Sequence, residues 1–341
     1  MRLVTYEIKT PLGRFERLGA ELGERIADLS LAYAWLLHQE GEPAAYRLAE
    51  AIVPPEINAF LQVGERAMTE ARRALAALNA HGGTPVGPQG ETLVHAPGAV
   101  RRLPPLPRPN SMRDFYAFEE HVRTGFEKRG EEIPAPWYEL PVYYKGNART
   151  MVGHEETVIW PRYTQKLDFE LELACVIGRE GRNIPVSEAH RYIAGFMVMN
   201  DISARDIQRK EMMVRLGPAK GKDFATVIGP ALVTPEEVGD MRDLPMSVRV
   251  NGEVWSTGNA GTSYWTFEQM IAHVSMDETL YPGDILGSGT VGRGCGLELD
   301  RWIQPGDVVE LEIARIGVLR NRIGDPISGP VPALRGQSAQ V

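Results

Sequence analysis

The chain has 341 residues, a length typical of about two domains and sufficient to bury a substantial hydrophobic core. Hydrophobic residues make up 43% of it and charged residues 24%, close to globular averages, which excludes disorder of the chain as a whole. The net charge is −8, with 45 acidic against 37 basic residues. A nucleic-acid partner requires a clustered excess of Lys and Arg, so we expect none.

Cysteine usage and hydropathy predict the compartment. Cys175 and Cys295 are the only cysteines, too few for a disulfide framework. The first ten residues alternate apolar and polar side chains and lack the apolar run of a signal peptide. No stretch approaches the roughly 18 consecutive apolar residues needed to span a bilayer. We therefore expect a cytoplasmic protein without a membrane partner.

The N-terminal part is predicted to combine strands with helices. Residues 3–8 alternate as in a strand, and after a Pro-Leu-Gly turn at 11–13 a second strand-like segment extends to Leu29. Helical periodicity, with many Ala, Leu, Arg and Glu residues, then covers residues 31–51 and 57–79. This order indicates a small α/β unit.

A proline-rich stretch separates this unit from the rest of the chain. Residues 82–98 are rich in Gly, Pro and Thr, and residues 103–110 contain four prolines. Proline fixes φ and removes a backbone donor, so such a run neither forms a helix nor joins a central strand ladder. We expect the domain boundary there, with an N-terminal domain at 1–108 and a second domain at 109–341.

Short strand-like runs dominate after the boundary. They are predicted at residues 167–177, 193–200, 225–233, 246–250 and 308–316. Asn251-Gly252, directly after the fourth run, is a strong hairpin signal. Helices are expected at 114–129, 187–192 and 266–274. The predicted fold class is therefore α+β and mostly β, with a smaller α/β N-terminal domain.

Two glycine-rich motifs resemble nucleotide sites but lack their structural context. Residues 287–292 spell G-x-G-x-x-G, yet a dinucleotide site needs a helix directly afterwards, and residues 297–299 look like strand. Residues 217–223 resemble a phosphate loop, but one residue is missing between the glycines. Asp223 also stands where a Ser or Thr should hold magnesium. Neither motif predicts a nucleotide site.

Acidic residues alternate with apolar ones in the segment Leu167–Leu173. On a strand, Asp168, Glu170 and Glu172 would share one face. Like charges at that spacing repel, most strongly if the face is enclosed. Taken alone, the pattern fits a solvated strand face at least as well as a metal-binding one.

Two further carboxylates allow both structural and functional readings. The almost wholly apolar run Ile193–Asp201 predicts a strand buried on both faces. Its last residue, Asp201, is either the first loop residue or a ligand delivered into a cleft. Asp114 begins a predicted helix, where an N-cap role suffices to explain it. Brought together, Asp114, Glu170, Glu172 and Asp201 would form an oxygen-only site suited to Mg²⁺, Mn²⁺ or Ca²⁺.

Seven segments between Arg113 and Glu298 resemble, in order and approximate spacing, the fumarylacetoacetate hydrolase family. They are Arg113–Tyr116, Leu140–Tyr144, Leu167–Glu172, Met199–Gln208, Gly221–Phe224, Gly287–Gly292 and Gly296–Glu298. The pairing of D-F-E-L-E with M-N-D-I-S-A-R-D-I-Q is the most specific part. The resemblance implies a mixed β-roll catalytic domain, a smaller N-terminal domain and a homodimer.

The resemblance also implies roles for individual residues. The implied ligands of a divalent cation, Mg²⁺ foremost, are Asp114, Glu170, Glu172 and Asp201, with Thr226 and Lys222 nearby. The implied catalytic groups are His121 with its carboxylate partner Glu298, and Lys222, Arg205 and Gln208 around a developing oxyanion. The implied substrate contacts are Tyr116, Arg129, Tyr144 and Thr290.

These roles predict a metal-dependent hydrolase that cleaves a carbon–carbon bond in a small β-diketo acid of the fumarylacetoacetate or acylpyruvate type. His121, oriented by Glu298, would take a proton from the attacking water. Positively charged and amide groups would stabilise the oxyanion. Without the resemblance, His121 reads as a polar helix residue, Glu298 as an outward residue of an amphipathic strand, and Lys222 as a solvated loop lysine.

Two alternatives stay open. Met212 or Met213 stands where fumarylacetoacetate hydrolases place a substrate-contacting tyrosine, so the reaction type is better supported than the substrate. Family members without the His–Glu pair tend to be decarboxylases or tautomerases of small keto acids such as oxaloacetate. A non-catalytic metal-binding protein with the same fold is the other alternative.

Overall fold

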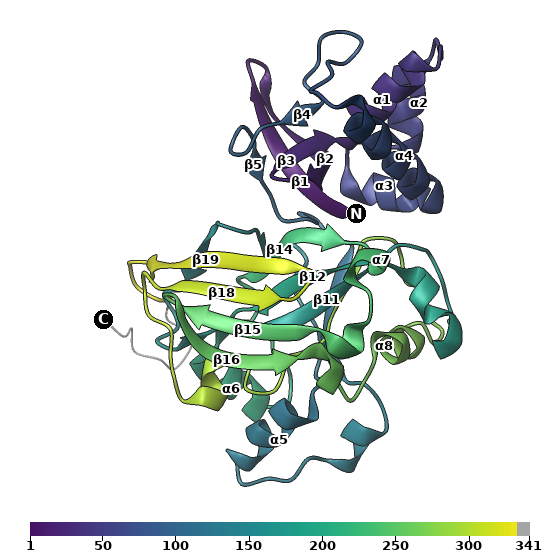
Figure 1. Ribbon diagram of the computed structural model, residues 1–341. Coiled ribbons are helices and arrows are strands. Elements are labelled where there is room, and N and C mark those ends of the chain that lie inside the picture. The colour runs from purple at the N-terminus through teal and green to yellow at the C-terminus, as the bar shows by residue number, and fades with distance from the viewer. Residues whose placement is uncertain (333–341) are drawn as a thin grey trace.

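The computed structural model describes residues 1–332, in which two sheets pack against each other (Figure 1). The larger sheet contains, in spatial order, β4 (Val94–His95), β3 (Arg25–Asp28), β2 (Gly13–Leu22), β1 (Arg2–Thr10), β14 (Thr226–Val233), β12 (Ile193–Asp201), β11 (Leu171–Ile177), β17 (Asp284–Gly287), β6 (Ser111–Phe115) and β7 (Tyr143–Lys145). Two further strands pair with β1 and β14, namely β5 (Arg101–Arg102) and β8 (Met151–Val152).

The smaller sheet is formed mainly by the C-terminal part of the chain. Its strands, in spatial order, are β16 (Glu253–Asn259), β15 (Pro245–Val250), β18 (Val308–Ile313), β19 (Gly317–Pro326) and β9 (Thr157–Trp160). A separate two-stranded ladder joins β10 (Leu167–Asp168) to β13 (Ser203–Ala204). Both large sheets are mixed, since β6 pairs with β17, β8 with β14 and β9 with β19 in parallel.

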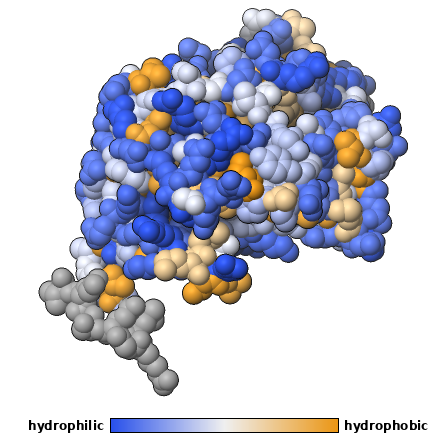
Figure 2. All heavy atoms as spheres, turned by 90° about the horizontal axis from the view of Figure 1, so that it is seen from below, coloured by the Kyte–Doolittle hydropathy of each residue, from blue (hydrophilic) through white to orange (hydrophobic). Residues whose placement is uncertain are grey.

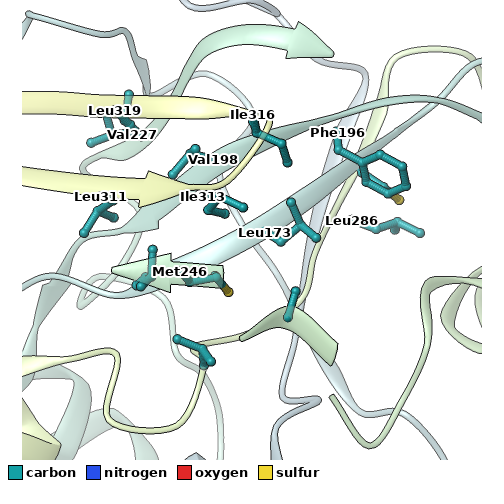
Figure 3. Packing of buried hydrophobic residues seen from close by; sticks show 14 of the residues in the cluster. Leu173, Phe196, Val198, Val227, Met246, Leu286, Leu311, Ile313, Ile316 and Leu319 are labelled. Carbon is teal, nitrogen blue, oxygen red and sulfur yellow. The ribbon is translucent and has the colours of Figure 1, made fainter. Parts of the chain in front are cut away.

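The main core lies between these two sheets (Figure 3). Strand β18 alternates half-buried and buried residues, so Leu311 and Ile313 point inward against Val198 and Val227 of the larger sheet. Strand β11 is buried throughout, and β12 is buried except at its half-buried first residue, Ile193, because a second apolar cluster covers their other face. The predicted near-continuous apolar run ending at Asp201 is explained by this double burial.

Four helices cover the N-terminal part of the larger sheet: α1 (Leu29–Gln39), α2 (Ala45–Ile52), α3 (Ile57–Val63) and α4 (Glu65–His81). The sequence predicted two long helices, and each of them is divided. Gly41 (φ 85°) lies between α1 and α2, and Gly64 (φ 74°) lies between α3 and α4. Both glycines adopt the left-handed region that favours glycine, which ends a helix and redirects the chain.

The N-terminal part shares its sheet and one apolar cluster with the remainder. Strand β1 pairs with β14, with Leu3 opposite Leu232. The cluster beneath the N-terminal helices contains Phe60 together with Met197 and Ile228 from the central strands. The domain boundary at residue 108 stays a prediction. Because of these contacts, the parts of the chain before and after that residue are coupled through one continuous sheet.

Deleting residues 1–108 is therefore expected to destabilise what remains. The fragment 109–341 would expose the edge of β14 and side chains such as Leu232 and Ile228, each worth about 1.5–3 kcal/mol when buried. We expect a melting temperature at least about 6 °C below that of the full chain. Thermal unfolding followed by circular dichroism measures the difference, and equal melting temperatures would contradict the coupling.

The remaining helices surround the second part of the chain. They are α5 (Glu119–Glu127), α6 (Arg205–Met213), α7 (Pro235–Val238), α8 (Phe267–Val274) and α9 (Gly296–Leu299), with 3₁₀ turns η1 (Ala135–Tyr138), η2 (Val186–Tyr192), η3 (Met241–Asp243) and η4 (Ala260–Thr262). The predicted helix at 266–274 is confirmed, with a capping box between Thr266 and Gln269. The predicted helix at 187–192 is a 3₁₀ helix.

Most of the strand predictions were confirmed. One predicted helix, at residues 114–129, and one predicted strand, at residues 297–299, were wrong. Runs 193–200, 225–233 and 246–250 are strands, and the run 308–316 holds β18. Residues 114–129 do not form one helix, because Asp114 belongs to β6, which hydrogen-bonds to β17 and β7, and α5 begins only at Glu119. Residues 297–299 are helical rather than extended.

The outer surface is predominantly polar on the face seen from below in Figure 2, where hydrophobic residues are scattered in small groups. Within residues 1–332, none of the helices combines the length and apolar composition of a bilayer-spanning segment.

Candidate metal centre and catalytic pair

Four buried carboxylates meet where several neighbouring strands of the larger sheet begin or end. Asp114 comes from β6, Glu172 from β11 and Asp201 from the end of β12, while Glu170 lies just before β11. These strands are near neighbours in the order β12-β11-β17-β6. Each residue offers an oxygen within 4.8 Å of those of the others, and none is more than 4% exposed.

The glycine-rich segment at 287–292 makes room for this cluster. Strand β17 lies between β11 and β6, and a Cβ at Gly287 would come within 2.4 Å of an Asp114 carboxylate oxygen. The backbone N–H of Gly289 donates a hydrogen bond to Asp114 Oδ1 at 3.2 Å. The glycines of this motif therefore allow the backbone to pack closely against the Asp114 carboxylate. This role agrees with the prediction that the motif is not a nucleotide site.

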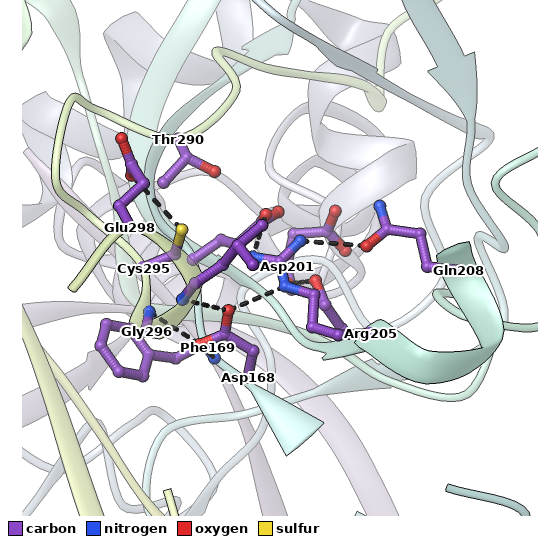
Figure 4. A network of polar contacts seen from close by, with 12 residues as sticks. Asp168, Phe169, Asp201, Arg205, Gln208, Thr290, Cys295, Gly296 and Glu298 are labelled. Carbon is purple, nitrogen blue, oxygen red and sulfur yellow. Dashed lines mark hydrogen bonds and ion pairs between the residues drawn. The ribbon is translucent and has the colours of Figure 1, made fainter. Parts of the chain in front are cut away.

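Asp168 does not join the cluster, although it alternates with Glu170 and Glu172 in the sequence. The chain leaves strand geometry between β10 and β11. As a result, Asp168 accepts hydrogen bonds from Arg205 Nε (2.8 Å) and from the backbone N–H groups of Gly296 (2.8 Å) and Leu297 (3.0 Å). Figure 4 shows it beside the start of α9, the helix that carries Glu298 and follows Cys295. The three acids thus lie in two different environments.

Two buried cations neutralise part of the cluster. Lys222 Nζ lies 2.6 Å from Glu170 Oε2 and also contacts Asp201, while Arg205 Nη2 lies 2.7 Å from Glu170 Oε1. Burial tends to raise the pKa of Glu170, but Lys222 and Arg205 outweigh it and lower that pKa. The Tyr144 hydroxyl donates to Asp201 Oδ2 at 2.7 Å. Positive charge is therefore concentrated on the Glu170 and Asp201 side.

Asp114 and Glu172, on the other side, have no ion pair within residues 1–332. Burial, followed by the charge of Asp201, raises the pKa of Asp114, and burial and Asp114 raise that of Glu172. Glu172 Oε2 and Asp201 Oδ1 are buried without a hydrogen-bond donor in the described part of the chain. Such orphaned oxygens in an oxygen-only donor set fit a hard divalent cation.

A histidine and a glutamate face each other beside this cluster. His121 of α5 places Nδ1 2.9 Å from Oε2 of Glu298 in α9, and both side chains are buried. Glu298 accepts hydrogen bonds from the backbone N–H of Arg293 (3.0 Å) and from Cys295 Sγ (3.3 Å). Burial tends to raise the pKa of Glu298, but His121 and these donors outweigh it and lower that pKa. Glu298 thus favours its ionised form opposite the imidazole.

The other residues implied by the resemblance divide into near and peripheral ones. Thr290 Oγ1 donates to Glu172 Oε1 at 3.2 Å, and Thr226 is the cross-strand partner of Asp201. The Tyr116 ring packs edge-on against His121, with 5.2 Å between centroids. All three therefore border the carboxylates or the histidine.

Gln208 and Arg129 lie further out. Gln208 accepts a hydrogen bond from Arg205 Nη1 at 3.0 Å (Figure 4). The Arg129 side chain is 50% exposed and pairs with Glu131 at 3.1 Å, and its guanidinium stacks over Phe126. Gln208 is thus linked to the cluster through Arg205, whereas Arg129 lies at the periphery.

Asp168 is a functional candidate to which the sequence analysis gives no role. Its place in the alternating run with Glu170 and Glu172 is the signal that could have identified it.

Replacing Asp168 with Ala should leave Arg205, whose side chain is 8% exposed, without one of its carboxylate partners. Breaking a buried pair costs about 3–5 kcal/mol, which chemical denaturation would measure. Glu253→Ala is the matched control, because its pair with Arg301 is exposed and worth about 0–1 kcal/mol. Equal effects of the two variants would contradict the anchoring role of Asp168.

Comparison with known proteins agrees with this architecture. Residues 110–324 match the model of the fumarylacetoacetate (FAA) hydrolase C-terminal family. The chain is 34% identical over 273 residues to the Homo sapiens protein named oxaloacetate tautomerase FAHD2A, mitochondrial, covering 80% of each chain. It is 34% identical over 207 residues to 2,4-didehydro-3-deoxy-L-rhamnonate hydrolase of Sphingomonas sp. (strain SKA58), covering 60% of this chain and 72% of that protein.

A solved structure extends the likeness to the N-terminal part. Fumarylacetoacetate hydrolase from Exiguobacterium antarcticum superimposes with a TM-score of 0.64 at 22% identity, covering 94% of this chain and 99% of that chain. At that identity the match shows a shared fold. The family match over residues 110–324 and the 34% identity to relatives carry the assignment further. The chain therefore belongs to the fumarylacetoacetate hydrolase family.

Proposed function

We propose that this protein is a divalent-metal-dependent hydrolase that cleaves a carbon–carbon bond in a small β-diketo acid of the fumarylacetoacetate or acylpyruvate type. The observation that supports this best is the 2.9 Å contact between His121 and Glu298 beside the four-carboxylate cluster. Hydrolysis needs a base that activates water, and a buried imidazole facing an ionised carboxylate is suited to that task.

Asp114, Glu170, Glu172 and Asp201 would hold the cation, for which we propose Mg²⁺, with Mn²⁺ or Ca²⁺ as alternatives. When bound, the cation supplies Lewis-acid polarisation of the substrate oxygens. The carboxylate oxygens without donors, Glu172 Oε2 and Asp201 Oδ1, are the atoms we expect to face it. Thr290 and Tyr144 orient Glu172 and Asp201 by hydrogen bonds.

The remaining groups of the chain would handle protons and charge. Glu298 lies next to His121 Nδ1, which leaves Nε2 as the nitrogen that accepts a proton from water. Lys222 and Arg205 would stabilise negative charge developing on the attacked carbonyl oxygen, with Gln208 holding the Arg205 guanidinium. We propose Tyr116, Arg129, Tyr144 and Thr290 as substrate contacts.

A second candidate is the tautomerisation of a small keto acid such as oxaloacetate. The Homo sapiens relative at 34% identity, which is named an oxaloacetate tautomerase, favours it. Tautomerisation moves a proton between carbon and oxygen and needs no attacking water. In that case His121 would exchange the proton directly with the substrate.

An assay of purified protein distinguishes the two reactions. The protein is stripped with EDTA, supplied with Mg²⁺ or Mn²⁺, and offered fumarylacetoacetate, a simple acylpyruvate and enol-oxaloacetate. Metal-dependent release of the cleavage products supports the hydrolase. Ketonisation of oxaloacetate without cleavage of either diketo acid would replace it by the tautomerase, and loss of CO₂ from oxaloacetate would indicate a decarboxylase.

We further propose a homodimer in a reducing compartment, the cytoplasm. The family resemblance supports the dimer, which multi-angle light scattering of the full chain would test. Both cysteines, Cys175 and Cys295, are free and buried, which accords with a reducing compartment.

A further inference from the structure

Three side chains beside the carboxylate cluster form a second group of potential metal ligands. His121, Cys295 and Glu298 each offer a donor atom within 4.8 Å of the others. Glu298 Oε2 lies 2.9 Å from His121 Nδ1 and 3.3 Å from Cys295 Sγ (Figure 4 shows the latter contact). The proposed hydrolysis uses the imidazole and the carboxylate and leaves the thiol without a role.

This donor set differs in kind from the four carboxylates. One nitrogen, one sulfur and one oxygen are the ligand types of zinc sites, whereas oxygen-only sets suit Mg²⁺. Ligands at 2.0–2.3 Å from a tetrahedral ion lie about 3.3–3.7 Å apart. The two contacts to Glu298 are within a few tenths of an ångström of this range.

We propose that His121, Cys295 and Glu298 form a second cation site, separate from the carboxylate centre, that takes Zn²⁺ or another thiophilic divalent ion. Three protein ligands would leave the fourth position of a tetrahedral ion to water. On binding, the Cys295 S–H bond breaks, its proton passes to solvent and the sulfur lone pair forms the bond to the ion. No oxidant or reductant is involved.

An unsatisfied nitrogen supports the site independently of the cysteine. His121 is 7% exposed, and its Nδ1 has no hydrogen bond within residues 1–332, although Glu298 Oε2 lies 2.9 Å away. The backbone of Cys295 is held by a β-bridge to Glu170, which fixes the thiol next to the histidine. A buried donor of this kind calls for a partner.

The site has a consequence that rests on the proposed function. An ion held by His121 and Glu298 would occupy the same two groups that activate water. Thiophilic ions would therefore inhibit an enzyme that Mg²⁺ activates, and excess Mg²⁺ would not relieve the inhibition, because the two ions prefer different donors.

Co²⁺ is the probe of choice, because a thiolate ligand gives it a near-ultraviolet charge-transfer band that oxygen ligands do not. The full chain is first saturated with Mg²⁺ and then titrated with Co²⁺. We expect the band in the natural sequence and in Cys175→Ala, the matched control, because Cys175 is buried in the hydrophobic core and is not one of the three proposed ligands. Cys295→Ser should abolish it, with folding checked by circular dichroism. X-ray absorption of the Zn²⁺ form should show one sulfur at about 2.3 Å.

Absence of the band in the natural sequence, or its persistence in Cys295→Ser, overturns the second site. Diketo-acid cleavage is measured separately with Mg²⁺ alone. Cleavage without a band leaves the proposed function standing and removes the second site. A band without cleavage supports the second site and removes the proposed function.

Discussion

Replacing His121 with Ala is expected to lower kcat for diketo-acid hydrolysis by about 100- to 10,000-fold, the usual contribution of a general base. The His121 imidazole lies 2.9 Å from the buried carboxylate of Glu298, beside the four-carboxylate cluster. It is not one of the four proposed metal ligands, so Mg²⁺ affinity should change little. Steady-state kinetics and calorimetric Mg²⁺ titration of the same preparation test both parts.

His190→Ala is the matched control for this variant. His190 is exposed at η2, away from the cluster, and its replacement should leave kcat unaltered. Full activity of His121→Ala would remove the water-activating pair from the mechanism. Loss of Mg²⁺ binding in that variant would mean instead that the histidine supports the metal centre.

Replacing Glu172 with Gln is expected to weaken metal binding and, at the same time, to stabilise the metal-free protein. Glu172 and Asp114 are buried side by side without an ion pair in the described chain, so removing one negative charge relieves repulsion. The gain should be on the order of 1–3 kcal/mol, the penalty typical of an unsatisfied buried polar group. Loss of a ligand should reduce metal affinity by more than the roughly 10- to 100-fold that loss of an outer-shell partner costs.

Denaturation in EDTA and in saturating Mn²⁺ separates the two effects. The natural sequence should gain about 2.7 kcal/mol when free Mn²⁺ is 100 times its dissociation constant, and Glu172→Gln should gain much less at the same concentration. Glu180→Gln, an exposed change shortly after β11, should behave like the natural sequence. A Glu172→Gln protein that is less stable in EDTA would contradict the repulsion argument.

Local patterns predicted much of the architecture. The alternation in β18, the apolar run of β12 and the capping residue Thr266 of α8 are all properties of neighbours in the chain, and the structure agrees with them. Two glycines set helix boundaries that the periodicity of apolar residues does not reveal. Gly41 and Gly64 interrupt helical periodicity that otherwise looked continuous, and a positive φ at each explains why one predicted helix became two.

Two candidate site residues were assigned the wrong local structure, for reasons that lie far away in the sequence. Asp114 looked like a helix N-cap but is on a strand, because β17, some 170 residues later, pairs with that segment. Glu298 looked like a strand residue but is on a helix. Asp168 accepts the N–H groups of Gly296 and Leu297, which stabilises the first turn there.

The acidic residues show most clearly where local sequence stops being informative. Asp168, Glu170 and Glu172 alternate alike, yet Asp168 pairs with Arg205 while the other two join Asp114 and Asp201. Residue types and strand periodicity follow from the sequence, since they depend on neighbours along the chain. The convergence of four carboxylates, and of His121 with Glu298, depends on strand order and on contacts between segments 30 residues (Glu170 to Asn200) to 177 residues (His121 to Glu298) apart, which only the folded chain creates.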